Sequence, residues 1–271
     1  MYSAGIDIGS VATKAVLFNG SIKESVIIPT GWSPREASRE ALARLLRERG
    51  IGMEDVHSIT VTGYGRTLAD FSDRAVTEIA CHGRGAFFLH RDVRTVLDIG
   101  GQDSKAISLD ERGSVTDFVM NDKCAAGTGR FLEVMAHLLG GEVQDLDLMA
   151  AGAEAQVISN MCTVFAESEV ISLLAKGVSK EAIARGILES VASRAVTLLG
   201  RVSVEPLIAF TGGASRSVVL KELIEQKIRA KLFVSPHAQI AGAIGAALTG
   251  WNGLLRKSRT ALAHEQNAGA Y

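Results

Sequence analysis

The chain has little of what marks several classes of protein. Only 5% of its 271 residues are aromatic, which argues against a β-sandwich and against a surface that stacks nucleic-acid bases. Neither sign of charge is in excess, because 29 Lys and Arg face 30 Asp and Glu, so we expect no nucleic-acid partner and no membrane partner. The three cysteines are too few, and odd in number, for a disulfide framework. Since Asp7 lies where a signal peptide needs an apolar run, these absences predict a cytoplasmic protein.

One long stretch without acidic or basic residues also fails as a membrane span. Residues 232–255 contain no Asp, Glu, Lys or Arg, and about 20 apolar residues are enough to cross a bilayer. Pro236, His237 and several glycines interrupt the stretch. Its centre, residues 241–248, consists mostly of Ala and Gly, which predicts a helix of small side chains that packs closely against another element.

What the chain does have is an internal repeat. Residues 5–16 align with residues 96–107 at an offset of 98 minus 7, or 91. Each copy predicts a short apolar strand that ends in Asp, an apolar residue and Gly, then a small polar turn, then a second strand that contains a Lys. A third strand follows in each copy, over residues 25–28 and 115–120. The chain is therefore predicted to be an α/β protein built from two duplicated units.

Other patterns place helices and strands around the repeat. Ser33 and Glu36 form a capping box with Pro34 between them, and Gly50 ends the predicted helix. Further helices are predicted over residues 130–139, 169–176 and 180–199, with strands over 58–62 and 207–210. The polar tail from Arg256 is expected to fray.

The repeated turns indicate phosphate binding. A Gly-rich turn after a strand exposes backbone N–H groups that can hold a phosphate, and an Asp at the strand end can hold a hydrated Mg²⁺ ion. A single Asp-Ile-Gly is a weak signal, but this chain has two copies and a third turn at Gly212 and Gly213. The P-loop and Rossmann patterns are absent from the sequence.

Three of these segments resemble a known superfamily. Residues 7–10, 98–103 and 211–214 are similar to the two phosphate motifs and the adenosine motif of the actin, sugar kinase and heat-shock chaperone ATPases. The resemblance implies two duplicated actin-like (ribonuclease H-like) subdomains with a nucleotide cleft between them. We expect the first subdomain to span residues 1–95 plus 249–271 and the second to span residues 96–248.

Two longer segments carry a closer resemblance. Residues 121–132 and 162–172, each with one cysteine, are similar to the activator ATPases of 2-hydroxyacyl-CoA dehydratases, a family whose members also serve benzoyl-CoA reductases and double-cubane cluster proteins. The similarity runs from about Gly5 to about Leu248. Residues 159–162 differ from the lead-in of the best-known activators, so the choice between a dehydratase-like and a double-cubane partner stays open.

The three cysteines have unlike surroundings. Cys124 and Cys162 each precede a predicted helix, where a thiolate has a lowered pKa and suits a metal ligand, whereas Cys81 is expected to be a small buried side chain. Two cysteines cannot complete a site of four thiolates, but a symmetric dimer would supply four. The resemblance implies one [4Fe-4S] cluster, held by Cys124 and Cys162 of each subunit of a homodimer.

The resemblance implies a function in which ATP drives an electron transfer. In the mechanism that the resemblance implies, a ferredoxin or flavodoxin reduces the cluster, ATP bound in each subunit's cleft changes the angle between the halves, and the dimer passes one electron to its partner metalloenzyme. The implied nucleotide cofactor is ATP/ADP. Two alternatives remain on the same scaffold: a small-molecule kinase, and a chaperone-like or sensor ATPase with structural cysteines.

Position in the motifs assigns a role to each candidate residue. Lys14 is preferred over Lys105 as a phosphate contact, and Glu167 and Glu169 are either nucleotide sensors or exposed helix carboxylates. The catalytic candidates, which act on Mg²⁺ or on the attacking water, are Asp7, Asp98, Gln102 and Asp103. The nucleotide-binding candidates are Gly9, Ser10, Lys14, Gly100, Gly101, Gly212, Gly213, Ala214 and Gln239, and the metal ligands are Cys124 and Cys162.

Overall fold

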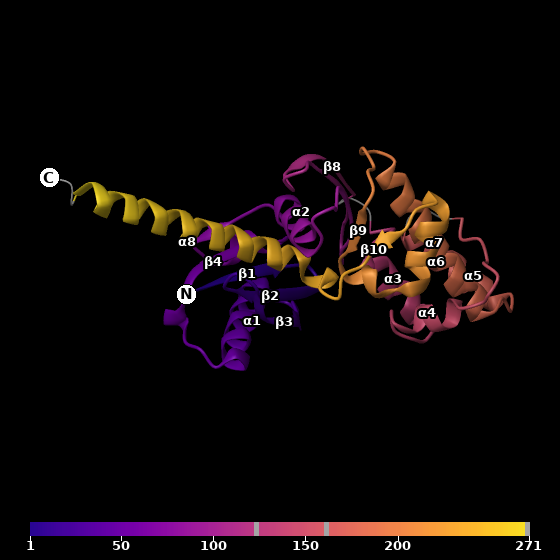
Figure 1. Cartoon of the computed structure of the whole chain (residues 1–271). Helices are drawn as coiled ribbons and strands as arrows, with labels where there is room; N and C mark the ends of the chain where they lie inside the picture. Colours follow the sequence, from indigo (N-terminus) through magenta and orange to yellow (C-terminus); the bar gives the residue numbers. More distant parts are fainter. Residues whose placement is uncertain (122–124, 160–162, 269–271) are drawn as a thin grey trace. The chain divides into compact units, whose positions relative to one another are not determined.

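The computed structural model describes residues 1–121, 125–159 and 163–268, and the chain forms two compact units (Figure 1). Unit 1 holds Met1–Leu89 and Ile240–Tyr271, and unit 2 holds His90–Gln239. The two boundaries between the units, 89/90 and 239/240, lie a few residues before the predicted boundaries, 95/96 and 248/249. The reason is that helix α2 (Glu78–Leu89) ends at the first division and helix α8 (Ala241–Ala268) begins just after the second.

Each unit is built on a five-stranded mixed sheet, and the two sheets have the same topology. The strand order is β3-β2-β1-β4-β5 in unit 1 and β8-β7-β6-β9-β10 in unit 2. In both, the first three strands form an antiparallel meander and the fourth lies parallel to the first. The duplicated α/β architecture predicted from the repeat is confirmed. The strands are β1 (Tyr2–Ile8), β2 (Ala12–Phe18), β3 (Ile22–Pro29), β4 (Val56–Thr62), β5 (Arg74–Ala75), β6 (Thr95–Ile99), β7 (Ser104–Leu109), β8 (Val115–Asn121), β9 (Ile208–Thr211) and β10 (Leu232–Phe233).

Helices cover the sheets, and several begin and end where the sequence predicts. The hydroxyl of Ser33 accepts a hydrogen bond from the Glu36 N–H at 3.3 Å, and Gly50 ends α1 with φ 70°. The patterns miss α2, whose interior glycines disfavour an isolated helix. The remaining helices are α1 (Pro34–Arg49) in unit 1, and α3 (Gly129–Leu138), α4 (Asp145–Ala150), α5 (Thr163–Ala175), α6 (Lys180–Leu199) and α7 (Val218–Ile228) in unit 2.

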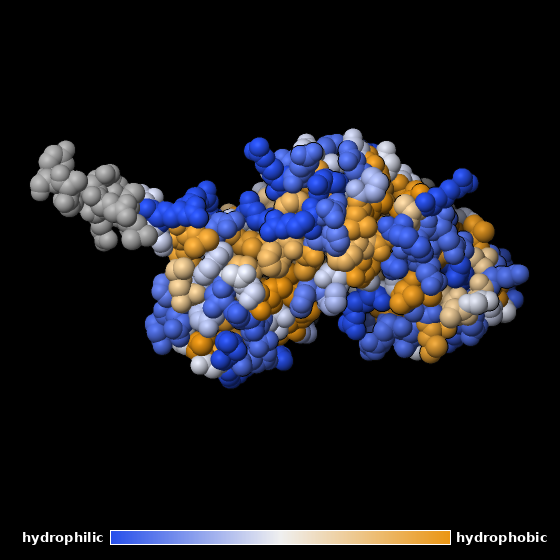
Figure 2. Space-filling model, viewed as in Figure 1, coloured by the Kyte–Doolittle hydropathy of each residue, from blue (hydrophilic) through white to orange (hydrophobic). Residues whose placement is uncertain are grey.

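The Ala- and Gly-rich segment forms the start of α8, which packs closely as predicted. A Cβ added to Gly5 of β1 would lie 2.1 Å from the Ala243 carbonyl oxygen, and one added to Gly245 would lie 1.9 Å from the Cys81 carbonyl oxygen. Only glycine permits such approaches of backbone to backbone. The tail from Arg256, which the sequence predicts to fray, continues α8 to Ala268, and its exposed segment 256–260 is hydrophilic (Figure 2).

The buried apolar side chains form one main core in unit 2 and two in unit 1. In unit 1, one core joins the sheet to α1, and the other lies where α8 covers Val16 and Phe18 of β2. In unit 2, α3 to α7 share one core with the sheet. Among the described residues, no helix combines the length and apolar character needed to cross a bilayer.

Candidate functional site

The first turn follows β1 and places a carboxylate beside a lysine. Asp7 pairs in register with Lys14 of β2, and the Lys14 Nζ lies 3.3 Å from Asp7 Oδ2. Asp7 is 4% exposed, while 19% of the Lys14 side chain remains exposed. The Gly9 N–H donates to the Ala12 carbonyl at 3.2 Å, which closes the turn. A partly exposed lysine next to a tight turn is well placed to contact an added anion.

The second turn, after β6, repeats this arrangement with more partners. Lys105 lies 3.3 Å from Asp98 Oδ2, the same distance as in unit 1, and it also pairs with Asp103. The Thr211 hydroxyl donates to Asp98 Oδ1 at 2.8 Å. Since the Lys105 side chain is only 2% exposed and has two carboxylate partners, it neutralises buried charge here. Of the two lysines, Lys14 is thus the more accessible.

A glycine in the left-handed region lies against each turn. Gly63 follows β4 with φ 88°, and Gly212 follows β9 with φ 86°. A Cβ added at these positions would lie 2.7 Å from the Ile8 carbonyl oxygen and 2.3 Å from the Ile99 carbonyl oxygen, respectively. The sequence motifs indicate Gly212 but not Gly63. The shared Thr-Gly pair, Thr62 with Gly63 and Thr211 with Gly212, is the signal that would have found it.

Different groups hold the carbonyl oxygens of the two turns. In unit 1, the Thr30 hydroxyl donates to the Gly9 carbonyl at 2.7 Å. In unit 2, the Gly129 N–H donates to the Gly100 carbonyl at 2.8 Å, and the Arg130 N–H donates to the Gly101 carbonyl at 2.7 Å. These donors are the first N–H groups of α3, which have no partner inside their own helix. The positive end of α3 therefore lies at the second turn, where it favours a bound anion.

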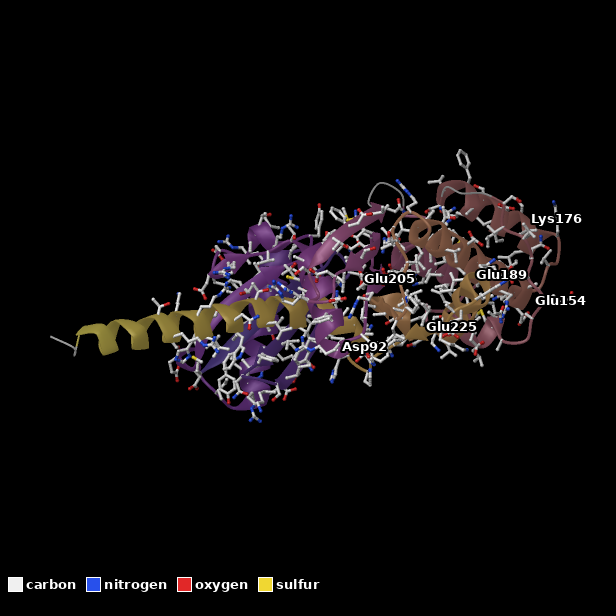
Figure 3. The ribbon with its side chains drawn as sticks, turned by 45° about the horizontal axis from the view of Figure 1, so that its top comes forward. Asp92, Glu154, Lys176, Glu189, Glu205 and Glu225 are labelled. Carbon is white, nitrogen blue, oxygen red and sulfur yellow. The ribbon has the colours of Figure 1, made fainter. Side chains whose placement is uncertain are left out.

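A pocket of about 580 Å³ lies in unit 2 beside the Gly212 turn. Its lining includes Gln239, one of the predicted adenosine residues, and Ser215, which directly follows the predicted segment 212–214. Gly213 has open space where a side chain would be. Two walls of the pocket, α7 and β10, are joined by the buried Glu225 (Figure 3), which accepts a hydrogen bond from the Leu232 N–H at 2.8 Å.

The charge on Glu225 helps to hold these walls together. Burial alone would raise the pKa of its carboxyl, but hydrogen bonds from the Leu232 N–H and from Lys231 and Lys221 outweigh burial and lower that pKa. Glu225 therefore stays ionised near neutral pH and keeps β10 fixed to α7. The pocket is thus preformed, as most small-molecule sites are.

The structure brings most of the predicted residues together within their own turns. Gln102 is exposed at the tip of the second turn, as a residue that orients a water molecule would need to be. Asp103 is committed to Lys105 by an ion pair, which favours Gln102 for that role. The residues of the first turn are Asp7, Gly9, Ser10 and Lys14, those of the second are Asp98, Gly100, Gly101, Gln102 and Asp103, and those beside the pocket are Gly212, Gly213, Ala214 and Gln239.

The two predicted cluster ligands, Cys124 and Cys162, lie outside the described residues. Within residues 1–121, 125–159 and 163–268, no group of three or more His, Cys, Asp or Glu side chains could hold a metal ion. Cys81 is fully buried and free, and burial raises the pKa of its thiol to about 11. It is the inert buried side chain that the sequence predicts.

Helix α5 begins at Thr163 and carries two features of interest. The carboxylate of Glu169 accepts the Ser159 N–H at 2.9 Å, so it anchors the chain three residues before Cys162, a role that the sequence does not reveal. The second feature is a set of exposed apolar side chains on the outer face of α5. Val164, Phe165 and Ile171 are each more than half exposed. Exposed apolar groups that gather on one helix mark an interaction surface.

Comparison with known proteins gives consistent matches. A model of the BadF/BadG/BcrA/BcrD ATPase family matches residues 4–250. The chain is 50% identical over 250 residues to the uncharacterized protein YjiL of Escherichia coli K12, and the aligned region covers 92% of this chain and 96% of that protein. It is 41% identical over 262 residues to the activator of lactoyl-CoA dehydratase of Anaerotignum propionicum, covering 95% and 100% of the two chains. The solved activator of the 2-hydroxyisocaproyl-CoA dehydratase from Clostridium difficile, with bound ADPNP, matches with a TM-score of 0.91 at 38% identity, covering 96% and 98%.

Proposed function

Because the chain belongs to the BadF/BadG/BcrA/BcrD ATPase family, we propose that it is an ATP-dependent reductase that activates a partner metalloenzyme. It couples ATP hydrolysis to the transfer of one low-potential electron from a [4Fe-4S] cluster. The observation that carries this proposal is the duplicated turn, in which each unit sets an Asp at a strand end beside a Lys and a glycine.

The two turns bind the phosphates and Mg²⁺ of ATP. Asp7 and Asp98 provide the hard oxygen donors that Mg²⁺ prefers, and such a site keeps several water molecules on the ion. Lys14 and the N–H groups of the glycine turns contact the phosphates, and Gln102 orients the attacking water. The matched C. difficile structure contains ADPNP, which supports nucleotide binding.

The pocket of unit 2 holds the nucleoside. Gly213 leaves room for close approach of the ribose, and Gln239 and Ser215 offer polar groups at the pocket wall. The walls are joined through Glu225, so this part of the site needs no rearrangement before the nucleotide binds.

Cys124 and Cys162 of two subunits hold the cluster, because four thiolates are the donor set that a [4Fe-4S] cluster takes. The cluster, when bound, supplies a one-electron redox centre of low potential. A homodimer is needed to complete the ligand set, and the apolar face of α5, which starts one residue after Cys162, supports self-association there.

The partner is a dehydratase-like enzyme or a double-cubane cluster protein, and the donor is a ferredoxin or flavodoxin. Two of the matched relatives are activators of 2-hydroxyacyl-CoA dehydratases, which supports the first of these partners. Transfer of an electron to an acceptor whose potential is lower by 100 mV costs roughly 2.3 kcal/mol. Such a transfer therefore needs an energy source besides the cluster, and ATP hydrolysis supplies that energy.

Iron and acid-labile sulfide analysis of the anaerobically purified protein tests this proposal. We expect about four irons per dimer, with a brown colour, in the wild type. Cys162→Ser should lose the iron, while Cys81→Ala, which alters the buried cysteine far from any predicted ligand role, should keep it. An iron-free dimer that still hydrolyses ATP after reconstitution would contradict electron transfer and favour the kinase or the sensor ATPase.

A second experiment separates the nucleotide from the cluster. Asp98→Asn should abolish ATP-dependent electron delivery and leave the iron content unchanged, because Asp98 belongs to the phosphate turn. Loss of iron in this variant would contradict the assignment of Asp98 to the nucleotide.

A further inference from the structure

The second phosphate turn and the chain that follows Cys124 share one hydrogen-bond network. We call residues 125–130 the cysteine loop, because they come directly after Cys124 in the sequence. Besides the two bonds from the Gly129 and Arg130 N–H groups to the turn, the Ser104 hydroxyl donates to the Gly127 carbonyl at 2.8 Å. Ser104 is the first residue of β7, directly after the turn, and is 4% exposed.

These bonds set the orientation of the groups that would touch a phosphate. In a planar trans peptide, the C=O and the N–H point in opposite directions. The loop holds the carbonyls of Gly100 and Gly101, so the N–H groups of Gly101 and Gln102, which belong to the same two peptide units, point away from the loop. An anion that binds these N–H groups therefore acts on the same two peptide units whose carbonyls anchor the start of α3, so that a displacement of these units reaches α3 directly.

The cysteine loop is packed too closely to absorb such a displacement. A Cβ added to Gly129 would lie 3.1 Å from the Gly100 carbonyl oxygen, which shows how closely the two segments pack. Thr128 is fully buried and its N–H donates to the Ala125 carbonyl at 3.1 Å. Gly127 has φ 87°, with the Arg194 side chain 2.9 Å from where its Cβ would be. A displacement at one end of the loop is thus transmitted along it.

We propose that Ser104 is a positioning residue that locks the cysteine loop to the second phosphate turn, so that nucleotide binding at the turn changes the conformation of the loop next to Cys124. This inference rests on the proposed function, since it requires the turn to bind phosphate. It adds the physical route by which the nucleotide state reaches the predicted cluster ligand.

In the described part of the chain, the bonds of the first turn lead elsewhere. Thr13 occupies the position equivalent to Ser104 in the repeat, and its hydroxyl lies 2.9 Å from that of Thr30, which in turn holds the Gly9 carbonyl. Thr30 directly follows β3, so these bonds return to the same sheet. The coupling is therefore a property of unit 2, and linkage requires that it act in both directions between loop and nucleotide.

Hydrogen exchange measured by mass spectrometry on the full chain, with and without Mg–AMP-PNP, tests the proposal. In the wild type, we expect the nucleotide to slow exchange of the Gly129 and Arg130 amides several-fold. Ser104→Ala should speed exchange of the loop without nucleotide by roughly tenfold, the effect of losing one buried hydrogen bond, and should abolish the nucleotide effect. Ser104→Thr should restore it, because Thr13 shows that the repeat accepts threonine there.

Ser108 supplies a matched control. It lies on the same strand, is 5% exposed, and donates to the Ser203 carbonyl at 2.8 Å, the same bond length as that of Ser104. Ser108→Ala should lower stability as much as Ser104→Ala but keep the nucleotide effect on the loop. A merely structural role for Ser104 predicts that the two variants behave alike.

Calorimetric titration with Mg–AMP-PNP distinguishes the two levels of the argument. A wild type that binds the nucleotide without any change in loop exchange would overturn the inference alone, as would a Ser108→Ala variant that loses the nucleotide effect. Failure of the wild type to bind Mg–AMP-PNP would overturn the proposed function itself.

Discussion

The two turns of the duplicated fold share a charge pattern and differ in how that pattern is anchored. In unit 1, Lys14 has one carboxylate partner and keeps 19% of its side chain exposed, while in unit 2, Lys105 has two partners and is 2% exposed. The first turn is tied to its own sheet, and the second to a helix. The two copies therefore share the Asp–Lys pair and the glycine turn, while among the described residues only the second turn is bonded to the start of a helix.

The same substitution at the two lysines should cost different amounts of stability. Lys105→Met leaves the buried Asp98 and the half-buried Asp103 close together without their shared cation, so we expect the free energy of unfolding to fall by about 3 kcal/mol. Lys14→Met should cost well under half of that, since the pair is partly solvated, but should weaken ATP binding. Urea unfolding and nucleotide titration measure the two effects. Equal losses of stability would break the comparison.

Gly63 and Gly212 should respond alike to substitution, because their backbone geometry is the same in the two units. Gly63→Ala and Gly212→Ala both place a Cβ on left-handed backbone against a carbonyl oxygen, so each should destabilise the protein by about 2 to 4 kcal/mol. Gly253→Ala serves as the control, because nothing lies within 4 Å of its added Cβ and it sits in α8. Thermal unfolding should show that this control is neutral or slightly stabilising.

The two threonines before those glycines should differ in sign. The Thr211 hydroxyl donates to a buried carboxylate, so Thr211→Val should cost about 2 kcal/mol. The Thr62 hydroxyl faces the Cys81 thiol, and within the described part of the chain it has no partner of ordinary hydrogen-bond geometry. Thr62→Val should therefore leave the unfolding free energy unchanged or raise it. Destabilisation by both variants to the same extent would mean that Thr62 has a counterpart of the Asp98 bond.

Near neutral pH, Cys81→Ala should lower the free energy of unfolding by about 1 kcal/mol. Its thiol pKa is raised to about 11, chiefly by burial, so the folded protein binds this proton more tightly than the unfolded chain does. The stability that this adds is complete below pH about 9 and is lost as the pH rises towards 11. Unfolding free energy measured from pH 8 to 11 should fall more steeply in the wild type than in Cys81→Ala. Parallel curves would show an ordinary thiol.

The sequence predicts the duplicated frame because its signals are local and occur twice. Asp7 and Asp98 end strands at the same point of two similar segments, and their lysines follow seven residues later, which sets the register of each pair. The local sequence does not predict that position 63 needs a glycine, because that need comes from the close approach of Ile8, which is distant in sequence. Helix α2 is not predicted from the sequence, because packing against α8 stabilises it and helix propensity does not.

The candidate site divides in the same way. The phosphate turns follow from residue types and spacing, whereas the assignment of Cys124 and Cys162 to a cluster rests on resemblance. The bonds from α3 to the second turn had no sequence signal, since they join backbone groups, which every residue has.

The close packing of α8 on β1 and α2 has a consequence for how the chain is made on the ribosome. Unit 1 is complete only when Ile240 and the residues after it have joined Met1–Leu89, and 239 minus 89, or 150, residues are translated in between. At 5 to 20 residues per second, that delay is roughly 8 to 30 s. During this time the apolar face of β2 with Val16 and Phe18 lacks its helix. In a nascent chain, this face stays uncovered until the residues after 239 have been made, whereas unit 2 is continuous in sequence and waits for no later segment.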